Sequence, residues 1–155
     1  MTKNSIKTRL IMIEQDTIKL LRECDAGIKM GISSINDVLS SVKSDRFYNK
    51  LNECKGEHQK LADELLSLLE KYEDDGKRAN PILKGMAKMK TEMKLAMHKD
   101  DKTIADLITD GCNMGVKSLN RYLNQYEAAD EVSKDIAKRL IHLEESLCRS
   151  AAEYL

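Results

Sequence analysis

Three histidines and four cysteines are the side chains best suited to metal or redox chemistry in this sequence. They are His58, His98 and His142, together with Cys24, Cys54, Cys112 and Cys148. Imidazole and thiolate groups bind Zn or Fe when three or four of them converge on one ion. No C-x-x-C pair, phosphate-binding G-x-x-x-x-G-K loop or recognisable nucleophile signature accompanies them. We therefore expect no nucleotide or nucleophilic chemistry, and any metal site must be assembled by the fold.

The composition excludes several classes of protein. The chain has 155 residues, and its 26 Lys or Arg balance its 26 Asp or Glu, so the formal net charge is zero. Proteins that bind nucleic acid usually carry a basic excess on one face, so we expect no nucleic-acid partner. Because 34% of the residues are charged and 41% are apolar, with one Pro, the composition is typical of amphipathic helices.

The start of the chain and the cysteines indicate the compartment. The apolar run Leu10–Ile13 is shorter than a signal-peptide core or a membrane span. The scattered cysteines fit free thiols in a reducing compartment better than a disulfide framework. The sequence therefore predicts a cytoplasmic protein with no stable membrane association.

Apolar residues recur every three or four positions along most of the chain, which predicts an all-α fold. We expect a single domain over 1–155, large enough for one core, with a helical extension at 1–15, a first hairpin at 16–76, a crossover with its own helix at 77–103 and a second hairpin at 104–155. The spacing leaves open whether residues 1–15 begin the first long helix or form a separate short one.

Capping residues mark the expected helix ends. Ser44 or Asp45 is the predicted N-cap of the second helix, and Gly76 is available for a left-handed turn after it. Asn80 followed by Pro81 predicts the start of the crossover helix.

One short segment occurs twice. Met30-Gly31-Ile32-Ser33-Ser34-Ile35-Asn36 reappears 84 residues later as Met114-Gly115-Val116-Lys117-Ser118-Leu119-Asn120, each time in the middle of an expected long helix. The two hairpins therefore look like duplicated halves joined by a long crossover, as in ferritin-like four-helix bundles.

The order of hairpin, crossover helix and hairpin, with the helix around Gly85-Met86-Ala87-Lys88-Met89-Lys90-Thr91-Glu92-Met93-Lys94, resembles the bacterial, rubrerythrin-related branch of the ferritin-like superfamily. That branch includes members with no assigned function. The resemblance covers about 16–155 and implies an up-down four-helix bundle whose core could hold two metal ions.

The usual ligands of such a centre are missing from this sequence. Ferritin-like di-iron sites use a Glu-x-x-His pair on each of two helices, and the chain contains no Glu-x-x-His. The residues three positions before the three histidines are Lys55, Leu95 and Arg139. Ile28 and Cys112 occupy core positions where a ligand Glu is expected. We therefore expect that the di-metal ligands have been lost.

A different metal site remains an alternative. His58 and His142 are also 84 residues apart, and hairpin geometry places Cys112 within about one turn of their level. A transition metal such as Zn or Fe could bind this His-His-Cys set. The competing interpretation, which we favour, is a packed core histidine beside Gly31 and Gly115, because His142 faces away from the centre of its apolar stripe.

Four of the eight methionines lie on one side of the crossover helix, at Met86, Met89, Met93 and Met97. With the nearby lysines, this stripe could dock in a partner's groove or on an anionic membrane. We expect instead that the stripe packs along the bundle and that the lysines face water.

The sequence thus predicts a non-catalytic interaction or scaffolding module without a cofactor, assembled as a homo-oligomer and with a possible protein partner. The alternative is a metal-binding or redox protein that uses the non-standard His and Cys residues. A weaker possibility is that residues before Asp16, or the methionine-bearing helix, form a docking surface.

Overall fold

The computed structural model describes residues 2–155, which fold into five helices joined by short connections. They are α1 (Lys3–Leu39), α2 (Asp45–Lys71), α3 (Pro81–Met97), α4 (Asp101–Gln125) and α5 (Glu131–Ala152). The all-α prediction is confirmed. Within the described residues, no helix is both long enough and apolar enough to cross a membrane.

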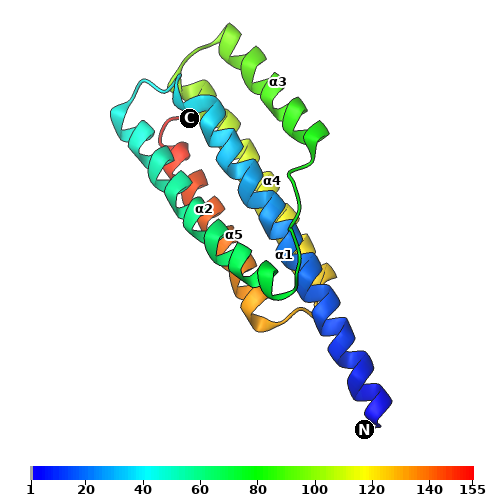
Figure 1. The fold of residues 1–155 in the computed structure, drawn as a ribbon. Coiled ribbons are helices and arrows are strands. Elements are labelled where there is room, and N and C mark those ends of the chain that lie inside the picture. The colour runs from blue at the N-terminus through cyan, green and yellow to red at the C-terminus, as the bar shows by residue number, and fades with distance from the viewer. Residues whose placement is uncertain (1) are drawn as a thin grey trace.

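Helices α1, α2, α4 and α5 form an elongated bundle in which α1 and α2 run antiparallel, as do α4 and α5 (Figure 1). Helix α1 contacts the other three bundle helices, and α2 contacts α1 and α5. Helix α3 lies outside this bundle and touches only α1 and α4. The observed order is therefore hairpin, crossover helix, hairpin.

The expected caps of α2 and α3 form. The Ser44 side chain accepts a hydrogen bond from the backbone N–H of Phe47, and Asn80 caps α3 directly before Pro81. Asp100 and Asp130 cap α4 and α5 in the same way. These side chains satisfy N–H groups that the first helical turn leaves unpaired.

The end of α2 differs from the expectation for Gly76. The left-handed residue that closes this helix is Glu73, with φ of 53°, and Gly76 adopts φ of 81° three residues later. Gly76 is required there because a Cβ would collide with the buried carboxylate of Asp25. That carboxylate accepts hydrogen bonds from Lys77 N and Lys29 Nζ, at 2.9 and 2.7 Å, and so fixes the crossover to α1.

Residues 3–15 belong to α1, which runs without a break from Lys3. This part of the helix extends beyond the end of the bundle (Figure 1). The first contacts of α1 with the α4–α5 connection are made by Asp16 and Thr17. Their side chains accept hydrogen bonds from the backbone N–H groups of Ala128 and Asp130.

The predicted packing of the methionine stripe is wrong. Met86, Met89, Met93 and Met97 are each 62–77% exposed, and no residue of α3 is buried. The opposite side of α3 faces the bundle instead. There, Lys94 pairs with Asp106 at 2.8 Å and Lys90 with Asp110 at 3.4 Å. Half-buried Leu95 also packs against the core, and these contacts turn the stripe outward.

Candidate functional site

The apolar core is divided by one polar layer. One cluster lies toward the α2–α3 connection and includes Ile28, Leu61 and Ile141. A second lies toward the α1–α2 connection and includes Ile35, Leu51 and Leu147. Between them, α2 contributes His58 and α5 contributes Glu144, both buried.

His58 and Glu144 form a direct pair. The Nε2 atom of His58 lies 2.9 Å from Oε1 of Glu144, and the imidazole is completely buried. The other ring nitrogen, Nδ1, lies 2.8 Å from the backbone carbonyl oxygen of Cys54 and 3.5 Å from its Sγ. A carbonyl and a carboxylate can only accept hydrogen bonds, so this geometry favours an imidazolium with a proton on each nitrogen.

The electrostatic surroundings agree with that protonation state. Burial by itself lowers the pKa of His58, but its hydrogen bonds with Cys54 and Glu144 and the charge of Glu144 outweigh burial and raise the pKa to about 10. The pair is therefore a positive and a negative charge held together in the core. Both ring nitrogens and one carboxylate oxygen are already engaged.

Two glycines lie beside this pair, and Gly31 makes room for it. A Cβ on Gly31 of α1 would lie 3.0 Å from His58 Nε2 and 3.3 Å from Glu144 Oε1. A Cβ on Gly115 of α4 would lie 3.5 Å from the Glu144 carboxylate. The two glycines of the repeated segment thus approach the same ion pair from two helices.

The three candidate metal ligands do not lie together. His58 is in the core, whereas the His142 side chain is 78% exposed and lies 3.5 Å from Glu145, one turn away on the same helix. Cys112 is buried, and burial together with the negative charge of Glu144 raises the pKa of its thiol. Within residues 2–155, no three His, Cys, Asp or Glu side chains are arranged to hold a metal ion.

Sequence reasoning missed Glu144. The apolar spacing of the last helix favours a face through Leu140, Leu143 and Leu147. The buried positions are Leu140, Glu144 and Leu147, and Leu143 is only half-buried. The signal was present in the sequence, because Glu144 stands four residues after Leu140 and three before Leu147. An acidic residue at such a position indicates a buried partner.

Chemically, the His58–Glu144 pair can hold a charge in the core. It can also favour the one alignment of the four helices in which the two side chains meet. The Cys112 thiol beside it is poorly suited to act as a nucleophile, because burial disfavours the thiolate. Comparison of the chain with protein-family models, curated proteins and solved structures gives no match. Function must therefore be inferred from the geometry of this chain alone.

Proposed function

We propose that the chain is a ferritin-like helical bundle that has lost its di-metal ligands and acts as a cytoplasmic, non-catalytic interaction module. Its docking face is the apolar stripe of α3, formed by Ile82, Met86, Met89, Met93 and Met97. The partner that fits this stripe best is a protein with an apolar groove, into which the helix lays its exposed face.

The exposure of the stripe is the observation that carries the proposal. Ile82 is 74% exposed, and each of the four methionines is at least 62% exposed. An amphipathic helix normally turns its apolar face to the core, yet α3 is held by Lys90, Lys94 and Leu95 on its other faces. Contiguous exposed apolar surface of this kind marks interaction sites.

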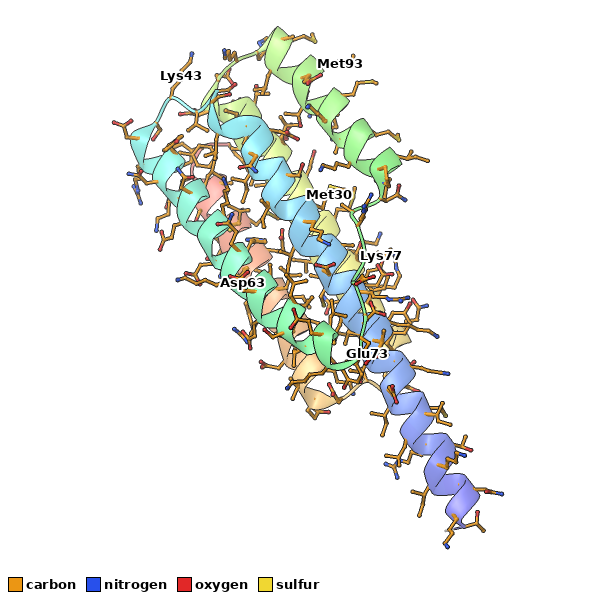
Figure 2. All side chains as sticks on the ribbon, in the orientation of Figure 1. Met30, Lys43, Asp63, Glu73, Lys77 and Met93 are labelled. Atoms are coloured by element: carbon orange, nitrogen blue, oxygen red, sulfur yellow. The ribbon has the colours of Figure 1, made fainter. Side chains whose placement is uncertain are left out.

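Charge and side-chain type narrow the class of partner. Lys84 and Lys88 also lie on α3 and make no ion pair within residues 2–155. They would complement acidic residues at the rim of a groove. Methionine side chains are flexible and polarisable, so the stripe can adapt to an irregular apolar surface. Figure 2 shows Met93 on α3, away from α2 and α5.

Ferritin-like descent and duplication are supported by the repeated glycines. Gly31 and Gly115 occupy matching positions in α1 and α4, and both approach the His58–Glu144 pair. In a ferritin-like centre, Glu144 would be followed three residues later by a ligand histidine, and Leu147 stands there instead. The cysteines are all free thiols, which fits the reducing compartment proposed.

A comparison of two variants that add charge to exposed methionines tests the docking face. Met89→Glu with Met93→Glu places two charges on the stripe, and Met114→Glu places one on an equally exposed methionine of α4. Proteins captured from a lysate by the wild type should be purified, and their binding to each variant measured by titration calorimetry. We expect the α3 variant to bind at least tenfold more weakly and the Met114 variant to bind normally.

Oxidation of the methionines provides a second readout. In the complex, Met86, Met89, Met93 and Met97 should be protected from hydrogen peroxide, and Met114 should not. Equal oxidation of all five in the free and bound protein would contradict the proposal. Binding to anionic vesicles, with no purified protein bound, would show that the stripe is a membrane face and would also contradict it.

The metal-binding alternative is tested by the metal content of the purified protein. The wild type and His58→Ala should be compared by elemental analysis after growth with added Zn and Fe. A stoichiometric metal in the wild type that is absent from His58→Ala would establish the alternative. Our proposal predicts no stoichiometric metal in either protein.

A further inference from the structure

The second unpartnered face of the molecule lies on the projecting part of α1. Ile6, Leu10, Ile11 and Met12 are 45–61% exposed there. About thirteen residues, numbers 3–15, project beyond the bundle, which corresponds to about 20 Å of helix. Residues 3–12 are all exposed, and Ile13 is half-buried where the bundle begins.

The exposed residues continue the buried face of α1 without a change of phase. Ile6, Leu10 and Ile13 lead into Thr17, Leu20 and Cys24 with alternating steps of four and three residues. The last three of these are completely or almost completely buried in the bundle. A stripe with this spacing is typical of the seam of a coiled coil. The core-facing stripe of α1 therefore continues beyond the end of the bundle core.

From this geometry we propose that the projecting segment is a dimerisation element that pairs antiparallel with the same segment of a second copy of the chain. In this register, Leu10 of each copy packs against Ile13 of the other, and Ile6 reaches the end of the other bundle, where α1 becomes buried at Thr17. The inference concerns a surface distinct from the α3 stripe and does not depend on the function proposed for α3.

Charges beside the seam favour this pairing. Lys7 and Arg9 precede Leu10, and Glu14 and Asp16 follow Ile13, so the segment is basic in its first half and acidic in its second. In antiparallel coiled coils, residues in equivalent flanking positions face each other. Lys7 then faces Glu14 of the other copy, and Arg9 faces Asp16, which gives four attractive pairs across the two-fold axis.

The bundle itself excludes a parallel dimer. Beyond Thr17 the seam of α1 is covered by α2, α4 and α5 of its own chain. Two parallel segments facing each other would force both bundles into the same space. Antiparallel segments place the bundles at opposite ends of the paired helices, as the projecting helix in Figure 1 allows.

The end of the bundle offers a place for the partner's tip. A shallow hollow there is lined by Thr17, Leu21, Leu68, Tyr72 and exposed Val132, among other residues. Figure 2 shows Glu73 at the same end of the molecule. The nearby α4–α5 connection carries Glu127 and Asp130. Lys71 and Asp130 also line the hollow, so its apolar part suits Ile6 of a partner segment, and its rim carries charges of both signs.

The size of the contact predicts a reversible dimer. Two paired helices of about 20 Å, with one shallow hollow at each end, reach at most the lower range of stable interfaces, roughly 1,200 Å². We therefore expect the full-length protein to form a weak dimer that dissociates on dilution.

Sedimentation equilibrium over a range of concentrations tests the dimer. Leu10→Asp should be monomeric throughout, because it buries a charge in the seam, and Met114→Asp should dimerise as the wild type does. Leu10 is 61% and Met114 69% exposed, so neither change affects the core of the monomer. A monomeric wild type, or a dimer that survives Leu10→Asp, would overturn the proposal.

Charge reversal tests the antiparallel register. Lys7→Glu or Glu14→Lys alone makes two symmetry-related contacts repulsive and should weaken dimerisation about tenfold. The double variant Lys7→Glu with Glu14→Lys restores opposite charges across the axis and should recover wild-type affinity. Failure of the double variant to recover would refute this register.

Discussion

Replacing Glu144 with Gln removes the charge that holds the buried His58 imidazolium and leaves the size of the side chain nearly unchanged. The pKa of His58 is 6.5 as a free side chain and about 10 in the fold. At about 1.36 kcal/mol per pKa unit, this difference makes the protonated ring worth up to about 5 kcal/mol of unfolding free energy. Breaking a buried pair at one partner commonly costs about 3–5 kcal/mol.

The pH range of the effect follows from the raised pKa. A group whose pKa is higher in the folded state stabilises the fold fully below its unfolded pKa, and it loses that contribution as the pH rises through the folded value. The stability supplied by His58 is therefore complete below about pH 6.5 and falls progressively toward pH 10. We expect Glu144→Gln to cost about 2–4 kcal/mol near pH 6 and less near pH 10, because the amide oxygen still accepts a hydrogen bond.

Urea unfolding followed by circular dichroism, repeated across this pH range, measures the effect. Glu145→Gln is a matched control, because Glu145 lies 3.5 Å from the exposed His142 one helical turn away. We expect the control to change the unfolding free energy by less than about 0.5 kcal/mol at every pH. The reasoning is refuted if Glu144→Gln and Glu145→Gln have the same pH dependence as the wild type.

Four further substitutions have expected outcomes, three measured by urea unfolding and the fourth by hydrogen exchange. Gly31→Ala should lower the unfolding free energy by about 1–2 kcal/mol, because its Cβ presses on the His58–Glu144 pair, whereas Gly111→Ala, in open space, should raise it by up to about 1 kcal/mol. Gly76→Ala should cost about 2–3 kcal/mol, because φ is 81° and the methyl group meets Asp25. Lys94→Ala should leave global stability almost unchanged but speed hydrogen exchange in α3, because its pair with Asp106 is exposed. Protection of α3 equal to that of the wild type would contradict the last expectation.

The helices were predictable because each has its own regular spacing of apolar residues and its own capping residue. The Asn80-Pro81 start of α3 and the Ser44 cap of α2 depend on a few neighbouring residues, so local sequence determines them. The orientation of α3 was not predictable in this way. Periodicity identifies an apolar face, but which face meets the bundle depends on Asp106 and Asp110, which lie on the next helix, α4.

The candidate site was predictable only in part for the same reason. His58 stood out because it lies on a clear apolar seam, and Gly31 because its segment is repeated. The partner Glu144 is 86 residues from His58, and only the packing of α2 against α5 shows that the two side chains meet. His142 matches the spacing of the repeat, but its position on α5 turns it to solvent.

The central claim is that His58 stays protonated and stabilises the fold, so that the exposed helix faces carry the function. Nitrogen NMR of the purified wild-type protein at about pH 8, before and after addition of one equivalent of Zn²⁺, tests this claim most directly. The account predicts that both ring nitrogens of His58 carry a proton and that their shifts do not change with Zn²⁺. A neutral ring at this pH, or a His58 nitrogen that loses its proton and binds the metal, would contradict it.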